Sequence, residues 1–576
     1  MTPARTLRLA YTAVLTLVVV VFSQRCGTPQ VAGDDWPVEG GRLVATFRTE
    51  PTNFNRLVDA GPVGRLSALL TQATLLRVDP TSGDLEPRLA TAWTGTPDGL
   101  TWTFTLRPGL KFSDGEPFSS SDVLFTFQAL YDERVGSQLG KEMQVGGLPL
   151  QVRALDDHHV VLTFPAPFGP GISILDSLPI LPRHKLKAAL DAGTFPAAWT
   201  ASTDLSAIAG MGPFVLTEYL PAQRMLFVRN PHFWRTDEQG RTLPYLDELE
   251  VPIVPEQNAE LLRMQAGQAD LINSGARAED LAMLRDAQTA GRLRLVEAGT
   301  SIDVSTFWFN LTPGAAATQQ KPWLGDEIFR RALSHAINRQ VIVDTVYLGA
   351  ATPVYGPVTP GHGEWYVPDM GATPFDLGRA RTLLTSIGLE DRDGDGVLED
   401  TRQRPVRFSI LTQRGNTDRE RTSAVLQEQL RQVGIAVDVV ALDVPALRGR
   451  FGSGDYEAMY YGASSNSKDP ADNMGFWLSS GGFHFWNPGQ SSPATAWEAA
   501  LDALMQRQAT TMDRADRRRL FAEAQQLLAD HVPALWFAAP TITVPISARA
   551  GGATPAVISP PVLWNAEQLY ITGPRR

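Results

Sequence analysis

Cysteine is almost absent from this 576-residue chain, in which Cys26 is the single thiol. One cysteine cannot form an intrachain disulfide, so the folded state has to be held by packing and hydrogen bonds. Hydrophobic residues make up 43% and charged residues 20% of the chain, which is enough apolar material for ordinary cores. At this length we expect about two to four domains rather than one.

Positively charged residues are also fewer than negatively charged ones. The chain has 51 Lys and Arg against 62 Asp and Glu, which gives a formal net charge of −11 and a pI near 5.3. Nucleic acid is therefore excluded as an expected partner, because binding its phosphates needs a basic surface. Net charge does not identify a small ligand, which is recognised at a local site.

Common catalytic signatures are missing as well. The sequence contains no Gly-x-Ser-x-Gly, no His-Glu-x-x-His and no Gly-x-x-x-x-Gly-Lys-Ser/Thr motif. Its eight histidines are scattered, and no pair of them has the spacing of a zinc site. We therefore expect a protein that is not an enzyme.

One apolar run stands near the N-terminus. Arg5 and Arg8 precede residues 9–22, a 14-residue apolar segment that is shorter than the roughly 20 residues of a spanning helix. Cys26 follows, in a position that resembles a bacterial lipoprotein attachment site, although Arg25 stands where that pattern has a small residue. We predict that residues 1–27 are an export signal or lipid-anchor segment, with ordinary cleavage and an uncleaved anchor as the alternatives, and that residues 28–40 are a linker.

Residues 101–131 form the clearest local pattern. Trp102, Phe104 and Leu106 alternate with threonines, which predicts a half-buried strand. Turn residues follow, and Ser119 stands three positions before Asp122, the spacing of a capping box that opens a helix.

The rest of the chain alternates strand and helix patterns. Apolar stripes predict helices over 326–340, 418–433 (capped by Thr417 and Glu420) and 513–530. Strand patterns cover 406–411, 435–442, 456–462 and 533–538. This alternation predicts an α/β fold.

Residues 101–131 also closely resemble the signature segment of the extracytoplasmic solute-binding protein family 5, the binding components of peptide, dipeptide and nickel ABC importers. Further segments resemble the family in the family's own order: EPRLATAWTGTPDG (86–99), GMGPFVLTEYLPAQRMLFVRNPHFW (210–234), FRRALSHAINRQVIVDTVYLGAATPVYGPV (329–358), AVLQEQLRQVGIAVDVV (424–440) and DRRRLFAEAQQLLADHVPALWF (516–537). The resemblance spans roughly residues 41–570.

The resemblance implies the two-lobe periplasmic-binding-protein fold, type II and cluster C, with an extra domain inserted in lobe I. Lobe I would comprise 41–85, 206–308 and 536–576, the extra domain 86–205, and lobe II 309–535. The chain would cross between the lobes near Asn310 and near Leu535, and ligand binding would close them.

By the same resemblance we expect an exported, monomeric protein, periplasmic or on the outer face of the membrane. It would bind peptides or a related solute between its lobes and deliver them to the permease and ATPase subunits of an importer. No cofactor would be required. Two alternatives on the same fold are a nickel or metal-chelate binder and a solute receptor without a transport role.

Family members that bind peptides hold the ligand carboxylate with an arginine, whose position matches Arg414, and the ligand ammonium with an aspartate. The aspartate position falls on Asn466, which has no charge and can only accept a hydrogen bond. Asp469 or Asp472 could replace it. The alternatives are a solvated loop arginine at 414 and a helix cap at Asp469.

Aromatic residues are dense around 477–486, where Trp477, Phe483, His484, Phe485 and Trp486 stand close together. Trp308 and Tyr460 flank this segment in the family's topology. We expect Trp308, Tyr460, Trp477 and Trp486 to line a ligand cleft, with core packing as the alternative for about half of the set.

The segment DRDGDGVLED (391–400) has the spacing of a calcium loop in its first half. Asp391, Asp393 and Asp395 reproduce the first three ligand positions, and Glu399 could supply the last carboxylate. Arg402 stands where the usual twelfth ligand belongs, so a plain Asp/Gly turn is the alternative to a structural Ca²⁺.

Overall fold

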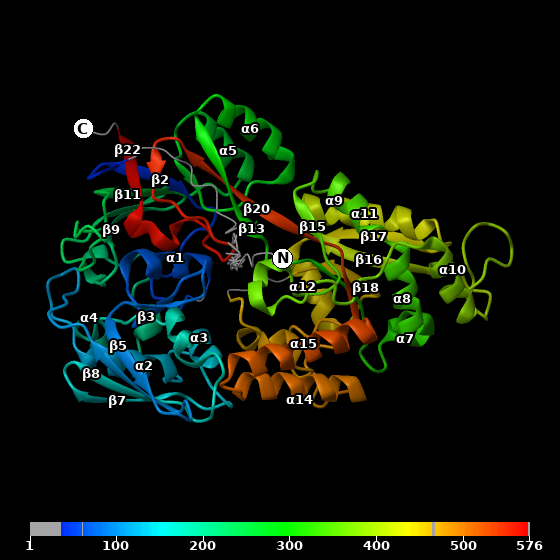
Figure 1. Ribbon diagram of the computed structural model, residues 1–576, viewed down its shortest axis with the longest axis horizontal. Helices are drawn as coiled ribbons and strands as arrows, with labels where there is room; N and C mark the ends of the chain where they lie inside the picture. The colour runs from blue at the N-terminus through cyan, green and yellow to red at the C-terminus, as the bar shows by residue number, and fades with distance from the viewer. Residues whose placement is uncertain (1–35, 60, 463–466, 574–576) are drawn as a thin grey trace, which may run out of the picture.

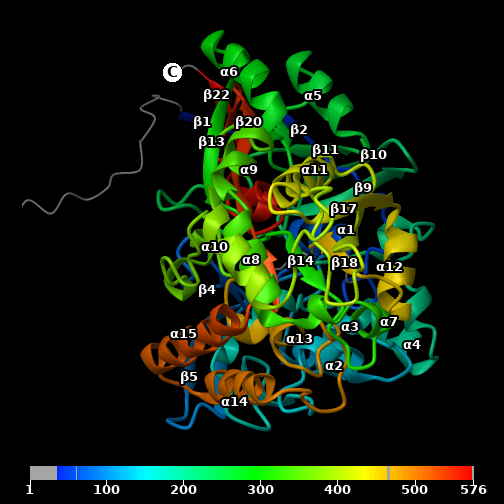
Figure 2. The same cartoon turned by 90° about the vertical axis from the view of Figure 1, so that its right-hand side faces the viewer.

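The computed structural model describes residues 36–59, 61–462 and 467–573. Two lobes lie side by side, each built on its own sheet (Figure 1). Figure 2 shows α5 (Gln257–Gln265) and α6 (Leu281–Thr289) at one end of the molecule, and α14 (Ala496–Thr510), α15 (Arg514–His531) and the extra domain at the other. Within the described residues, no helix is both long and apolar enough to cross a membrane.

Lobe I contains an eight-stranded mixed sheet. Its strands, in spatial order, are β13 (Leu293–Thr300), β20 (Ala538–Ser547), β12 (Leu271–Ile272), β2 (Arg42–Thr46), β11 (Glu248–Pro252), β10 (Arg224–Arg229) and β9 (Phe214–Leu220), with β15 (Ala351–Pro353) paired to β20. Beside the sheet lie α1 (Pro62–Thr71), the strand pair β3 (Leu76–Val78) and β4 (Leu85–Pro87), and a small sheet of β1 (Trp36–Val38), β22 (Tyr570–Gly573) and β21 (Ala550–Gly551).

The extra domain is an antiparallel sheet with helices packed against it. The strand order is β5 (Ala90–Gly95), β6 (Thr101–Leu106), β8 (His159–Thr163) and β7 (Gln151–Asp156), and the helices are α2 (Ser120–Tyr131), α3 (Gln138–Glu142) and α4 (Arg183–Asp191). The predicted capping box is confirmed, since the Asp122 carboxylate accepts from the Ser119 backbone N–H at 3.0 Å. Phe104 of β6 belongs to the same continuous core as Leu43 of β2, so the extra domain is rigidly joined to lobe I.

Lobe II is built on a five-stranded sheet in the order β17 (Ala436–Leu442), β16 (Arg407–Gln413), β18 (Ala458–Tyr461), β14 (Thr306–Phe309) and β19 (Ala534–Trp536). Around it lie α7 (Ala316–Gln320), α8 (Glu327–Ala336), α9 (Arg339–Thr345), α10 (Leu377–Ser386), α11 (Thr417–Arg431), α12 (Val444–Ser453), α13 (Met474–Trp477), α14 and α15. Phe307 and Trp308, neighbours on β14, belong to two different cores, so both faces of this sheet are covered.

Two of the predicted helices differ from the observed ones at their caps. The segment expected as one helix over 326–340 is two helices, because the Asn338 side chain accepts from the N–H groups of Gln340 and Val341 and starts α9. Helix α11 is capped by Asn416, which accepts from the Arg419 N–H, and not by Thr417 as predicted.

The chain changes sheet earlier than expected at its first crossing. Strand β14 pairs with β18 and β19 of lobe II, so the crossing lies between Thr300 and Thr306 and not near Asn310. Trp308 therefore belongs to lobe II, whereas the predicted lobe I range runs to residue 308. At the second crossing, β19 ends at Trp536 and β20 begins at Ala538, close to the predicted Leu535.

Candidate ligand-binding cleft

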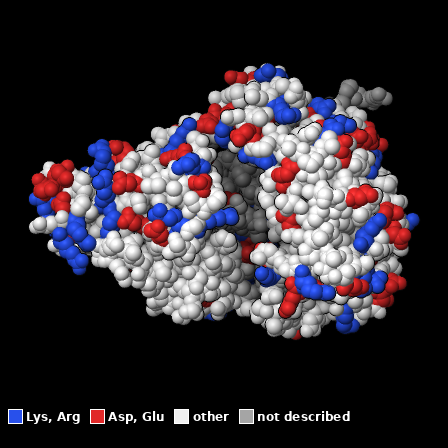
Figure 3. Space-filling view, turned by 180° about the vertical axis from the view of Figure 1, so that it is seen from behind, with Lys and Arg blue, Asp and Glu red and all other residues white. Residues whose placement is uncertain are grey.

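A cleft of about 1450 Å³ separates the two lobes. Figure 3 shows the hollow between them from behind. Lobe I contributes α1, β3 and the loop after it; the extra domain contributes the segments 138–147 and 166–179; lobe II contributes 362–365, 467–478 and the facing parts of α14 and α15. Both charged and apolar side chains reach this space.

The lobes touch directly at the edge of the cleft. The Lys468 Nζ donates to the Pro80 carbonyl of lobe I at 3.0 Å. The Gly169 N–H of the extra domain donates to the Ala509 carbonyl of α14 at 2.6 Å. A Cβ on Gly169 would meet the Arg517 Nε at 2.5 Å, so glycine permits this close approach.

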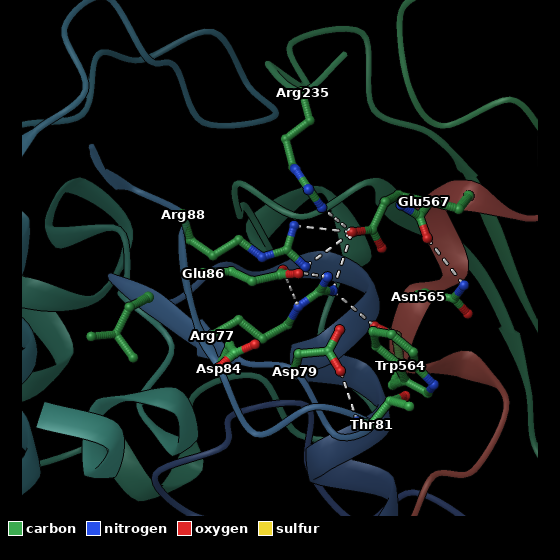
Figure 4. Close-up of polar contacts among 12 residues, drawn as sticks. Arg77, Asp79, Thr81, Asp84, Glu86, Arg88, Arg235, Trp564, Asn565 and Glu567 are labelled. Carbon is green, nitrogen blue, oxygen red and sulfur yellow. Dashed lines mark hydrogen bonds and ion pairs between the residues drawn. The ribbon is translucent and has the colours of Figure 1, made fainter. Parts of the chain in front are cut away.

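Glu567 is the centre of a cation cluster on the lobe I wall (Figure 4). Its Oε1 lies 3.3 Å from the Arg77 Nη1 and 2.9 Å from the Arg88 Nη2, and it also pairs with Arg235. Burial would raise the pKa of Glu567, but the charges of Arg88, Arg77 and Arg235 together outweigh burial and lower the pKa to about 2. The carboxylate is therefore ionised over the whole neutral range.

Asp469 and Asp472, two of the predicted ammonium ligands, lie on the lobe II wall of the cleft. Both oxygens of Asp469 bind Arg517, at 2.5 and 2.8 Å, and Oδ1 also accepts from the Ala471 N–H at 2.9 Å. Asp469 thus serves as a cap and as the ion-pair partner of Arg517, so its negative charge is already matched by a cation in contact. Asn466 lies outside the described residues.

Among the described residues that border the cleft on this wall, Asp472 is the carboxylate without a cation in contact. Its Oδ2 accepts from the Ser467 Oγ at 2.5 Å. Burial first, and the nearby charge of Asp469 second, raise the pKa of Asp472 to about 7. Across the cleft, burial likewise raises the pKa of Asp176 to about 6, against the charges of nearby arginines.

Arg414 lies directly after β16 on the surface of lobe II. It is exposed, and its Nη2 donates to the Ala441 carbonyl at 2.9 Å. It does not border the cleft. Its role in carboxylate binding stays a prediction that its position does not support.

Four aromatic residues expected to line the cleft are in the cores instead. Trp308, Tyr460, Trp477 and Trp486 are only 1–3% exposed. Trp308 stacks on Phe485 with ring centroids 4.6 Å apart, and Trp477 meets Phe521 edge-on at 4.9 Å. The expectation is corrected for a physical reason: Trp308 and Tyr460 lie on strands of a sheet that is covered on both faces, and Trp477 and Trp486 pack against helices α14 and α15 in the second core, so these rings have no surface left for a ligand.

Other aromatic side chains border the cleft. From the aromatic segment around 477–486 only Phe483 does so, and it is 55% exposed. The remainder come from the extra domain, the lobe I loops and lobe II: Phe168, Phe233, Trp234, Trp365 and Trp564. The sequence did not single these out as ligand contacts, because no periodic pattern separates a cleft aromatic from a core aromatic.

The predicted calcium loop brings its four acidic residues together. One oxygen each from Asp391, Asp393, Asp395 and Glu399 lies within 4.8 Å of the others. The first three are exposed and Glu399 is buried. The loop follows α10, far from the cleft (Figure 1).

Residues 84–485 match the sequence model described as bacterial extracellular solute-binding proteins, family 5, middle. The chain belongs to this family. The match covers most of the two lobes and the extra domain, and it agrees with the two-lobe α/β architecture described above.

Curated relatives agree with this family. A probable ABC transporter-binding protein of Deinococcus radiodurans is 28% identical over 421 residues, 70% of each chain. The dipeptide-binding protein of Escherichia coli is 26% identical over 535 residues, 89% of this chain and 92% of that protein. Another relative is named as heme-binding protein A.

Solved structures share the fold. The oligopeptide-binding protein AppA of Bacillus subtilis, in complex with a nonapeptide, has a TM-score of 0.70 and 24% identity, and covers 93% of this chain and 100% of its own. Similar folds hold Fe(III)-EDTA and Ni(L-His) in other proteins. The family is one of solute-binding proteins, and the names of the curated relatives include both dipeptide-binding and heme-binding proteins.

Proposed function

We propose that this solute-binding protein takes peptides, or a related solute of mixed polarity, in the interlobe cleft and delivers them to the permease of an ABC importer. The observation that carries the proposal is the cleft itself. Its volume of about 1450 Å³ exceeds what a single amino acid fills. Aromatic rings beside charged groups suit a ligand with apolar side chains and charged ends.

A metal chelate is the weaker candidate. Among the described residues that border the cleft, His362 is the one imidazole, and its Nδ1 accepts from the Thr359 N–H at 3.1 Å. His484, in the aromatic segment around 477–486, is fully buried between the Phe476 carbonyl and Glu498. Neither histidine belongs to a ligand cluster of the kind that holds a transition metal.

The test is mass spectrometry of what co-purifies with the chain expressed without residues 1–27 and released by denaturation. We expect a mixture of short peptides. A single non-peptide compound would overturn the peptide assignment and leave the family assignment intact. Peptides added back to the protein should also be recovered unchanged, since the proposal includes no turnover.

The N-terminal segment completes the proposal. Residues 1–27 export the protein, and Cys26 anchors it to the outer face of the membrane, where it acts as a monomer. Cys26 lies outside the described residues, so the support comes from the sequence pattern. Intact-mass measurement of protein extracted from membranes should show a lipid on the N-terminal cysteine; a free N-terminus at another residue would contradict it.

We also propose that the loop of Asp391, Asp393, Asp395 and Glu399 takes a structural Ca²⁺. The convergence of four carboxylate oxygens within 4.8 Å supports it, as does the positive φ of +90° at Gly396, in the loop position where calcium loops turn sharply.

A further inference from the structure

Among the described residues, six arginines border the cleft, and four of them have a carboxylate partner. Arg77 and Arg88 share Glu567, Arg517 binds Asp469, and Arg514 binds Glu364. The two that remain are Arg56, in the loop before α1, and Arg65 on α1. Both therefore differ from every other arginine on the walls of the cleft.

Arg56 and Arg65 are held in place by backbone carbonyls alone. The Arg56 Nη1 donates to the Asp59 carbonyl at 3.2 Å, and the Arg65 Nη1 donates to the Ser559 carbonyl at 3.1 Å. Among the described residues, no carboxylate oxygen lies within 4.0 Å of either guanidinium. Arg56 is only 5% exposed.

The acidic groups nearby have other partners. The Asp59 Oδ1 accepts from the Gly61 N–H at 2.7 Å, and its Oδ2 from the Thr52 hydroxyl at 3.3 Å. Glu142 accepts from the Gln138 amide at 3.2 Å, and Asp176 accepts from the Val78 N–H. These acids lower the local positive potential without pairing directly with Arg56 or Arg65.

Two guanidinium groups so placed are costly for the empty protein. Burial, and then the positive charge of Arg56, lower the pKa of Arg65 to about 10. Burial also lowers the pKa of Arg56. Arg56 is buried and Arg65 is half-buried, and for a cation so placed with no anion in contact a single backbone carbonyl restores only part of the lost solvation. An anionic group of a bound ligand would restore the balance and could accept hydrogen bonds from both guanidinium forks.

We propose that Arg56 and Arg65 form an anion subsite on the lobe I wall that holds a carboxylate of the bound solute. This inference rests on the proposed function, since it assigns the charge and the orientation of that solute. The carboxylate end lies against lobe I, and the remainder extends toward the aromatic and lobe II walls. Arg414, exposed and away from the cleft, has no part in it.

The experiment measures thermal stabilisation and Kd with three synthetic libraries of di- to pentapeptides. The first has neutral side chains and free C-terminal carboxylates, the second is its C-terminal amide, and the third is amidated but carries one glutamate. Each is tested on the wild type and on R56Q, R65Q and the double variant. R414Q and R153Q are the controls, since Arg153 is exposed in the extra domain and does not border the cleft.

The expected result is that the free acids stabilise the wild type and both controls, that the amides do so much less, and that the double variant binds the acids roughly 10- to 100-fold more weakly. If only the glutamate library binds, with the same dependence on Arg56 and Arg65, the subsite stands and its carboxylate is a side chain. The single variants carry the same test if the double variant does not fold.

Other outcomes would overturn the anion subsite, and they distinguish its failure from failure of the proposed peptide-binding function. Equal binding of acids and amides, or undiminished binding by a folded variant, removes the subsite while peptide binding stands. Binding of none of the libraries contradicts the peptide function. In that case the thermal stability of the protein in sodium citrate is compared with its stability in sodium chloride at equal ionic strength. Citrate should stabilise the wild type but not R56Q or R65Q if the subsite exists. If citrate does not stabilise the wild type, the subsite is overturned.

Discussion

Arg421 of α11 and Glu279, just before α6, form an ion pair at 2.9 Å that joins lobe II to lobe I. Arg277 also approaches Glu279, at 3.1 Å, from within lobe I. The Lys468 Nζ, which donates to the Pro80 carbonyl, makes a second contact between the lobes. Both contacts exist only while the lobes are close together, so they favour the closed arrangement.

Replacement of Arg421 by glutamine should shift the lobes toward a more open state. The two side chains are 46% and 31% exposed, so the pair is worth at most about 1 kcal/mol, roughly a fivefold change in population. Small-angle X-ray scattering should give a larger radius of gyration for R421Q at low salt, and the difference from the wild type should shrink at high salt. R431Q, whose partner Glu428 lies on the same helix, should leave the radius unchanged.

Replacement of Glu567 by glutamine should destabilise lobe I by about 3 kcal/mol, because three arginines lose their shared buried anion. The pKa of Glu567 is about 2 in the folded protein, below its unfolded value, so its contribution is present above pH 4.5 or so and is lost as the pH falls toward 2. Chemical denaturation at pH 7 and at low pH should show this loss. E218Q, which breaks an exposed pair with Arg224, should cost no more than about 1 kcal/mol.

Replacement of Asp472 by asparagine should have the opposite effect at neutral pH. The pKa of Asp472 is raised to about 7 in the folded protein, so its ionisation opposes folding. That cost is absent below pH 4 or so and grows as the pH rises toward 7. D472N should therefore increase the free energy of unfolding at pH 7.5 by about 1–3 kcal/mol, and with it Tm, and it should leave both nearly unchanged near pH 4.5. A lower Tm at pH 7.5 would contradict the prediction; D84N, at an exposed site, is the control.

Truncation of Trp308 and of Phe483 should separate core aromatics from cleft aromatics. W308A should cost about 3–5 kcal/mol, because it leaves a cavity beside Phe485 in a core that is closed on both sides. F483A should change stability by less than about 1 kcal/mol while weakening ligand binding, since this ring is 55% exposed at the cleft. Equilibrium denaturation and titration of the co-purified ligand check both; equal loss of stability would refute the distinction.

Removal of calcium should lower the stability of lobe II without abolishing ligand binding. The four carboxylates of Asp391, Asp393, Asp395 and Glu399 repel one another when no cation lies between them, and the loop is distant from the cleft. Excess chelator should therefore reduce Tm, and added Ca²⁺ should restore it. In D391N the chelator should have little effect. No shift in the wild type would argue against the site.

The sequence predicted the local structure correctly where that structure depends only on residues within one short segment. The strand Thr101–Leu106 and the helix capped by Ser119 and Asp122 form as predicted, because alternation and capping depend on residues within a few positions of each other. The predicted N-cap of α11, Thr417, lies one residue after the observed N-cap, Asn416. Both residue types cap helices well, so the sequence alone does not choose between them.

The sequence predicted the residues of the candidate site much less well than it predicted the local structure. The sequence indicated an aromatic segment at 477–486, but burial of Trp477 and Trp486 depends on helices α14 and α15, which pack against them from later in the chain. No pattern in the sequence indicated Arg56 or Arg65 as ligand contacts. Their distinguishing property is the lack of a carboxylate partner, and partners far away in the sequence cannot be read from spacing.

By itself, the sequence determined the α/β class, the family and the acidic loop at 391–399, because these depend on local patterns and on the order of motifs along the chain. Only the tertiary structure decided which aromatics face the cleft, which acids have a cation in contact and which arginines lack an anion. Those properties arise when segments such as Arg77, Arg235 and Glu567, hundreds of positions apart, meet in one desolvated place.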